Sequence, residues 1–133
     1  MHPDLARLEQ QFNPSVLTRV KDSRLEPFKI EVWMKRDDRL HPFISGNKWR
    51  KLKFILNHAL SMGSDTIISM GGAYSNHLHA LAFAGKMLGI NTAAFVRGEK
   101  PDNFNPTLSD LEHWGMKLRF VSRTEYRQLR KLL

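Results

Sequence analysis

The chain has 133 residues, enough for one domain with a hydrophobic core, and its 41% hydrophobic and 26% charged content is typical of a soluble globular protein. It contains no cysteine, which excludes disulfides, thiol catalysis and thiolate metal sites. No apolar run approaches membrane-spanning length, and the first residues do not have the pattern of a secretory signal. We therefore expect a cytoplasmic protein with no membrane partner.

The 21 lysine and arginine residues exceed the 13 acidic residues and give a formal net charge of +8. A basic excess can attract nucleic acid. Here the basic residues are dispersed, which is typical of a solvated surface, so we expect no nucleic-acid partner. The densest group is Arg119, Arg123, Arg127, Arg130 and Lys131.

The first 45 residues predict a short helix, an extended arm and one strand. Leu5, Leu8 and Phe12 have helical spacing, and residues 28–35 alternate as in a strand. Asp37 and Asp38 follow this strand. Because adjacent side chains of an extended segment point apart and basic residues flank the pair, we interpret them as partners in local ion pairs or a turn.

Residues 46–60 predict an amphipathic helix with Lys48 in its first turn. Lys48 falls at the edge of the apolar stripe, whereas Arg50 and Lys53 fall on the opposite, solvated face. Burial and the positive end of the helix dipole both disfavour an ammonium ion, so Lys48 suits a nucleophilic amine that forms a Schiff base. The alternative is an ordinary lysine with its stem along the stripe and its charge in water. The stripe consists of Trp49, Leu52, Ile55, Leu56, Ala59 and Leu60.

The rest of the chain alternates buried-strand and helix patterns, which predicts right-handed crossovers and a parallel sheet covered by helices on both faces. The last helical pattern ends at Leu132 and Leu133 without a cap, and we expect that the chain continues in a longer protein. Strands are predicted at 66–70, 92–96 and 117–121, and helices at about 76–88, 106–115 and 123–133.

The loop at residues 71–76 is the candidate binding site, because ligands of open parallel sheets bind beyond the carboxyl ends of the strands. Its glycines let a ligand approach the backbone, and Ser75 and Asn76 offer a hydroxyl and an amide beside the free N–H groups of a helix start. Alternatively, Ser75 or Asn76 is simply a helix cap and the glycines serve the turn. The residues alone leave both interpretations open.

Three runs together carry a resemblance to a known family: MKRDD at 34–38, SGNKWRKL at 45–52 and MGGAYSNH at 70–77. They resemble the pyridoxal-phosphate-dependent D-cysteine desulfhydrases and 1-aminocyclopropane-1-carboxylate deaminases, within the tryptophan-synthase-β-like group. The resemblance covers residues 30–133. It implies an α/β protein of fold type II, with a three-layer parallel sheet and flanking helices. Residues 1–45 would be an arm and strand of the large domain, and residues 46–133 an incomplete small domain.

The resemblance also implies which residues bind the cofactor, pyridoxal 5'-phosphate. Lys48 would be the catalytic lysine and would hold the cofactor as a Schiff base. Asn76 would contact the ring hydroxyl of the cofactor. Asn47 and Lys51 would support the cofactor site.

Further implied residues meet the substrate, a small amino acid. Ser75 would contact its carboxylate or assist proton transfer, with Asn76 and His77 beside it. A histidine at position 77 favours the desulfhydrases, because the deaminases usually carry glutamine there. No metal is expected, since His77 and His79 are two apart and cannot share a helix face.

The implied reaction releases ammonia and a 2-oxo acid, and the full-length protein would be a homodimer. The family's phosphate-binding glycine loop, its partner for the pyridine nitrogen and its later active-site tyrosines cannot be located in this sequence. We therefore expect this chain alone to be inactive. The alternatives are a non-catalytic remnant or interaction module with a basic surface, and an enzyme of the same fold and cofactor with another reaction.

Overall fold

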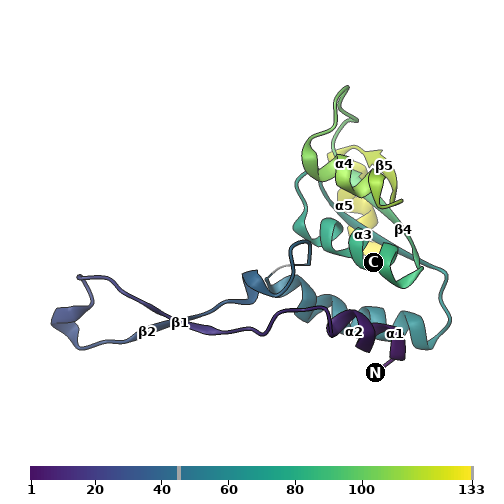
Figure 1. The fold of residues 1–133 in the computed structure, drawn as a ribbon. Coiled ribbons are helices and arrows are strands. Elements are labelled where there is room, and N and C mark those ends of the chain that lie inside the picture. Colours follow the sequence, from purple (N-terminus) through teal and green to yellow (C-terminus); the bar gives the residue numbers. More distant parts are fainter. Residues whose placement is uncertain (45, 133) are drawn as a thin grey trace.

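The computed structural model describes residues 1–44 and 46–132. A body of helices and a three-stranded sheet carries a two-stranded ribbon that extends away from it (Figure 1). In the described part of the chain, no helix is both long and apolar enough to cross a membrane. The elements are α1 (Pro3–Glu9), β1 (Leu17–Val20), η1 (Glu26–Phe28), β2 (Val32–Lys35), η2 (Asp37–Arg39), α2 (Asn47–Ser61), β3 (Thr66–Gly72), α3 (Asn76–Leu88), β4 (Asn91–Arg97), α4 (Pro106–His113), β5 (Lys117–Val121) and α5 (Arg123–Leu132).

The sheet has the order β3-β4-β5 and both of its pairings are parallel. Thr66 pairs with Asn91 in the first ladder, and Ala93 pairs with Lys117 in the second. The parallel strands and the helices between them confirm the prediction for this part of the chain. The last helix also agrees with its predicted range as far as Leu132; Leu133 lies outside the described residues.

The two faces of the sheet carry different helices. Thr92 is buried against Gly85 of α3, whereas Arg97 holds its guanidinium over the ring of Tyr126 in α5. Because side chains alternate along a strand, positions 92 and 97 lie on opposite faces of β4. Helix α3 packs on β3 and β4 on one face, α4 packs against α3 and β5, and α5 contacts β4 on the other face.

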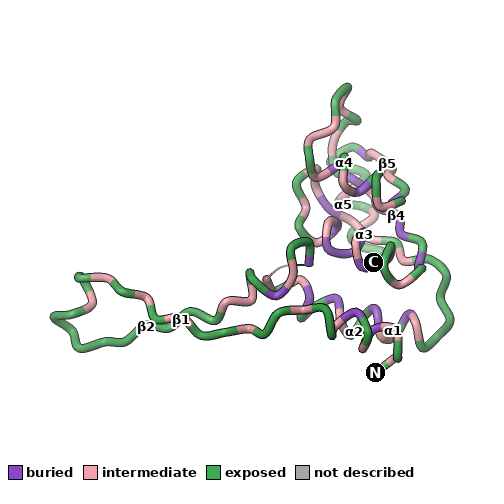
Figure 2. Tube along the Cα trace, in the orientation of Figure 1, coloured by how far each residue is buried: buried purple, intermediate pink, exposed green. Residues whose placement is uncertain are grey.

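The predicted coverage of both faces is wrong for β3, whose Ile68 is 58% exposed. The N-terminal strand also differs from its prediction. Lys29 has a left-handed backbone (φ 51°) after η1, so strand β2 begins at Val32 rather than at 28. Its antiparallel partner β1 was not predicted. Both strands of the ribbon are largely exposed (Figure 2).

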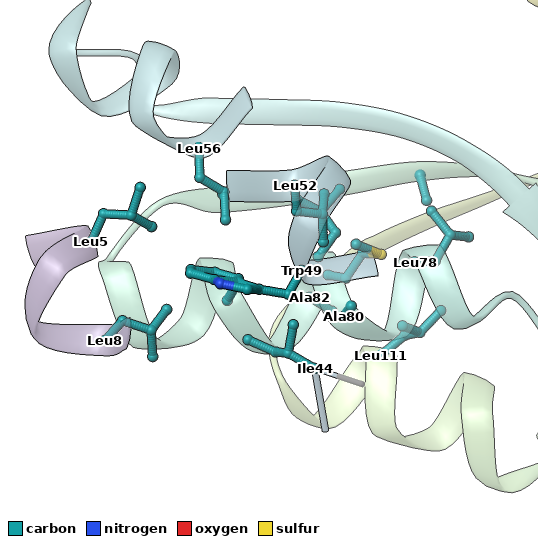
Figure 3. Close-up of a cluster of buried hydrophobic side chains, with 14 of the residues drawn as sticks. Leu5, Leu8, Ile44, Trp49, Leu52, Leu56, Leu78, Ala80, Ala82 and Leu111 are labelled. Carbon is teal, nitrogen blue, oxygen red and sulfur yellow. The ribbon is translucent and has the colours of Figure 1, made fainter. Parts of the chain in front are cut away.

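The hydrophobic core lies between α1, α2, α3, α4 and the sheet (Figure 3). Helix α2 contributes residues at helical spacing, as predicted, but Ile55 of the predicted stripe is 51% exposed. Leu5 and Leu8 of α1 belong to the same cluster, so the start of the chain packs with the later helices. The division into residues 1–45 and 46–133 stays a prediction. The α2 residues in the core are Trp49, Leu52, Leu56 and Ala59.

The start of α2 depends on Gly46. Its backbone has φ 63° and ψ −143°, which L-residues rarely adopt, and a Cβ there would meet no atom within 4 Å. We expect Gly46→Ala to lower the free energy of unfolding by about 1–3 kcal/mol through backbone strain alone. Urea unfolding followed by circular dichroism measures this, with Gly72→Ala as the control because Gly72 lacks a positive φ. Equal stability of the two variants would contradict the prediction.

Candidate functional site

Lys48 lies partly buried in the first turn of α2, and Asn47 and Lys51 beside it are exposed. The turn is held from outside the helix, because the Gly46 N–H donates to the Asp37 carbonyl at 3.0 Å. Ser45, the first residue of the SGNKWRKL run, lies outside the described residues. Lys48 is therefore placed by a helix whose start is tied to the preceding segment.

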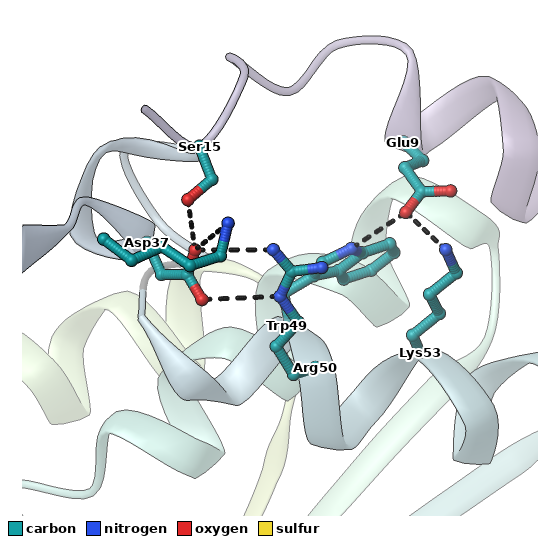
Figure 4. Close-up of polar contacts among 7 residues, drawn as sticks. Glu9, Ser15, Asp37, Trp49, Arg50 and Lys53 are labelled. Carbon is teal, nitrogen blue, oxygen red and sulfur yellow. Dashed lines mark hydrogen bonds and ion pairs between the residues drawn. The ribbon is translucent and has the colours of Figure 1, made fainter. Parts of the chain in front are cut away.

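Asp37 ties three parts of the chain together (Figure 4). Its carboxylate accepts a hydrogen bond from Ser15 Oγ at 2.5 Å and pairs with Arg50 of α2 at 3.4 Å and with Lys35 at 3.8 Å. The hydrogen bonds from Ser15 and Arg50 hold the pKa of Asp37 below its usual value. Asp38 pairs with Arg36 at 2.6 and 2.8 Å. The interpretation as a local ion-pair partner is confirmed for Asp38, whereas Asp37 pairs both with the nearby Lys35 and with the more distant Ser15 and Arg50.

Glu9 of α1 holds the next turn of α2 (Figure 4). It accepts hydrogen bonds from Trp49 Nε1 at 3.3 Å and from Lys53 Nζ at 2.5 Å. The Lys53 hydrogen bond is the main cause of a lowered Glu9 pKa. Arg50 is exposed, as predicted, whereas Lys53 is partly buried. Each also pairs with a carboxylate that is distant in sequence, which the sequence did not predict.

The candidate loop follows β3 as a tight turn. The Ser75 N–H donates to the Gly72 carbonyl at 3.1 Å, and Ser75 Oγ accepts from the Leu78 N–H at 3.1 Å. Ser75 is therefore the N-cap of α3, as the simpler interpretation predicted. The cap uses the oxygen as an acceptor, so the hydroxyl hydrogen stays available to a ligand. The N–H groups of Asn76 and His77 point out of the helix start, where an α-helix offers them no intrahelical partner.

His77, in the first turn of α3, is bonded to strand β3. It is partly buried, and its Nε2 lies 2.8 Å from Ser69 Oγ of β3. Burial, and next the positive charges of Lys48 and Lys51, lower the pKa of His77 below its usual value. Helices α2 and α3 pack against one another, and the first turn of α2 is near enough for its lysine charges to act on His77.

Asn47 and Asn76, which the sequence also predicted as site residues, are not held by other side chains that the structure describes. The side chains of Asn47 and Asn76 are exposed, and among the described residues no hydrogen bond is assigned to either. His79 bonds to Asp110 of α4 at 2.8 Å, whereas His77 bonds to Ser69 of β3, so the two histidines have different neighbours. Ser69 was missed by the sequence analysis, although its position in β3 faces α3.

Chemically, the site combines amines, a hydroxyl and free backbone N–H groups. Lys48 offers a primary amine, and Lys51 adds a second positive charge. The N-terminus of α3 adds N–H donors and the positive end of a helix dipole. Such a set attracts an anionic ligand and offers one amine for covalent attachment.

Relatives of the chain were found by sequence and by structure, although no protein-family model matches it. Over 71 residues it is 46% identical to a Pyrococcus abyssi protein named for 1-aminocyclopropane-1-carboxylate deaminase, covering 53% of this chain and 22% of the relative. Over 74 residues it is 42% identical to the mitochondrial bifunctional D-cysteine desulfhydrase/1-aminocyclopropane-1-carboxylate deaminase of Arabidopsis thaliana, covering 56% and 18%.

A crystal structure of an ACC deaminase homologue superposes on the chain with a TM-score of 0.74 at 27% identity. The superposition covers 99% of this chain and 42% of that one. The chain therefore spans less than half of the solved relative, and its alignments span about a fifth of the two curated relatives.

Gly71 and Gly72 offer a matched pair of substitutions in the loop. A Cβ on Gly71 would lie 2.6 Å from Ser75 Oγ and 2.9 Å from Leu78 Cδ1, whereas one on Gly72 would meet only Arg97 Nη2 at 3.9 Å. We expect Gly71→Ala to cost roughly 1–3 kcal/mol and to displace the Ser75 cap. Gly72→Ala should change stability by no more than about 0.5 kcal/mol.

Urea unfolding and hydrogen exchange at the Leu78 amide, which the cap protects, measure these effects. If the Leu78 amide hydrogen exchanges at the wild-type rate in both alanine variants, the close packing of Gly71 against Ser75 does not hold the cap.

Stability should fall as the pH drops from about 7.5 to 5.5. Burial lowers the pKa values of His41 and His77 in the folded chain, so the unfolded chain binds more protons in this range. The contribution is complete above the unfolded pKa of about 6.5 and is lost as the pH falls toward the folded values. Urea unfolding at a series of pH values measures the slope.

The control is a double variant, His41→Asn with His77→Gln. His41 Nδ1 accepts from the Phe43 and Ile44 N–H groups, and an asparagine oxygen keeps an acceptor there without titrating. The double variant should show a flatter dependence, and an unchanged slope would assign the effect to other groups.

Proposed function

The chain is related in sequence and fold to part of the D-cysteine desulfhydrases and 1-aminocyclopropane-1-carboxylate deaminases, and we propose that it carries the lysine half of their active site. In the complete protein this site would serve a pyridoxal-phosphate-dependent deaminating lyase. The observation that carries the proposal is that α2, with Lys48 partly buried in its first turn, packs against α3, whose first turn Ser75 caps. The charge of Lys48 also contributes to the lowered pKa of His77, next to this cap.

The residues at this place fit such a cofactor. A partly buried amine is suited to bond with an aldehyde, and the exposed Asn76 amide can donate to a ring hydroxyl. The charge of Lys51 and the N–H groups of α3 favour an anionic group nearby. When bound, pyridoxal phosphate supplies an electron-accepting ring that stabilises negative charge at the substrate α-carbon.

Each residue then has a proposed task. Lys48 attaches the cofactor and, when its amine is free, accepts a proton at Nζ. Ser75 donates its hydroxyl hydrogen to the substrate carboxylate or passes a proton. Asn76 orients the cofactor ring, and Lys51 with Asn47 supports the anionic groups.

His77 is proposed to contact the substrate as a neutral imidazole. Burial and the neighbouring lysines favour its uncharged form, because they lower its pKa. With Nε2 at Ser69, its Nδ1 is the nitrogen left for a ligand. A neutral imidazole both donates and accepts hydrogen bonds, as a polar substrate side chain requires.

We further propose a small amino acid as substrate, with D-cysteine and 1-aminocyclopropane-1-carboxylate as the first candidates, and ammonia and a 2-oxo acid as products. The complete protein is proposed to be a cytoplasmic homodimer of fold type II. Its three-layer sheet would extend the three strands described here. Product formation from D- and L-amino acids by a full-length relative of this chain distinguishes a deaminating lyase from another reaction of the same fold.

Reductive labelling tests the lysine directly. The chain is incubated with pyridoxal 5'-phosphate, reduced with borohydride and mapped by peptide mass spectrometry. We expect the pyridoxyl label to concentrate on Lys48 because this amine is partly buried and lies in a helix packed against α3, whose start favours an anionic group. Lys48→Ala should remove most of the label.

The matched control is Lys86→Ala, which removes an exposed lysine of α3 and should leave the label on Lys48 unchanged. A label spread evenly over the lysines of the wild-type chain would overturn the proposal for this polypeptide.

A further inference from the structure

Asn105 connects the start of α4 to the candidate loop. It is the N-cap of α4, and its Oδ1 accepts from the Leu108 N–H at 2.8 Å. Its Nδ2 donates to the Ala73 carbonyl at 3.0 Å. The two ends of one partly buried amide thus hold two segments that are 32 residues apart in the chain.

Ala73 lies inside the turn that precedes the Ser75 cap. The turn closes when the Ser75 N–H donates to the Gly72 carbonyl, and Ala73 also packs against the hydrophobic core. The Ala73 carbonyl is thus a fixed point in the middle of the turn, and the backbone that carries Ser75 and Asn76 leaves directly from it.

Helix capping alone does not explain the amide. Aspartate and serine cap helices about as well as asparagine, because only an acceptor oxygen is needed. Asn105 does more than cap: its Oδ1 accepts from Leu108 while its Nδ2 donates to the Ala73 carbonyl, and neither aspartate nor serine has a second polar atom that donates in the place of Nδ2. Tyr74 in the turn is 78% exposed, so the turn is held by its own Ser75–Gly72 bond, by the packing of Ala73 and by the bond from Asn105.

We propose that Asn105 is a positioning residue that fixes the Gly72–Ser75 turn and thereby orients Ser75 Oγ and Asn76 toward the ligand of Lys48. The effect on the ligand rests on the proposed function, whereas the effect on the turn does not. Asn105 itself does not touch the reacting atoms; it acts through the Ala73 carbonyl.

The test separates the capping bond to Leu108 from the bond to Ala73. Asn105→Asp keeps an acceptor for the Leu108 N–H but has no donor for Ala73. Asn105→Ser keeps the acceptor without adding charge, and its shorter side chain has no second polar atom in the place of Nδ2. Both variants should unfold at nearly the wild-type urea concentration. Asn103→Asp, in the exposed loop just before α4, is the control for the added charge.

Two readouts report on the turn and the site. Hydrogen exchange at the Ser75 and Leu78 amides should accelerate roughly three- to tenfold in both Asn105 variants, the range expected for the loss of one hydrogen bond. The yield of pyridoxyl label on Lys48 at subsaturating cofactor should fall by a similar factor. Asn103→Asp should leave both readouts unchanged.

If amide hydrogen exchange and the labelling of Lys48 both stay at the wild-type level in the two Asn105 variants, the inference is overturned. A loss of global stability that accounts for the whole change in exchange would also overturn it, because Asn105 would then be a structural cap only. If the wild-type chain does not label Lys48, the proposed function fails, while accelerated exchange in the Asn105 variants still supports the effect on the turn.

Discussion

The burial of Trp49 is the constraint on which the position of Lys48 depends. The indole is 2% exposed, and its N–H donates to Glu9. Removing such a side chain from a core typically costs about 3–5 kcal/mol, so the rotation of α2 about its axis is strongly fixed. Successive helical residues differ by about 100°, and the neighbouring Arg50 is held by Asp37. Lys48, one residue before Trp49, is therefore held partly buried at the edge of the buried stripe.

Helix α3 provides the other half of the site because its small residues let it approach the sheet closely. A Cβ on Gly85 would lie 2.5 Å from Thr92 Cγ2, so this position accepts only a glycine at the observed distance. Helix α3 also packs against α2, and the charges of Lys48 and Lys51 act on His77 at the positive end of the α3 dipole. An anion bound there would offset this repulsion, which links the packing of the helices to the proposed function.

The sequence predicted the elements whose signal is local and failed where the determining partner is distant. Strands and helices from residue 47 onward followed from periodicity and caps such as Ser75 and Asn105. The ion pair between Lys53 and Glu9 did not, because these residues are 44 apart and a lysine in that pattern is normally solvated. Strand β1 was missed because no short turn joins it to β2 and its exposed residues show no buried face. The bond from Ser69 to His77 likewise required the observed packing of α3 on β3.

Ser75 illustrates why a structural role and a proposed chemical role do not exclude one another. From sequence, a cap and a ligand contact were alternatives, because one hydroxyl had to be assigned to one task. In the structure the cap uses Ser75 Oγ as an acceptor from Leu78, which also fixes the direction of the side chain. The hydroxyl hydrogen remains a donor, and the rotamer entropy that a ligand contact would cost has already been lost on folding. The same group thus stabilises α3 and is preorganised for the anionic ligand that we propose.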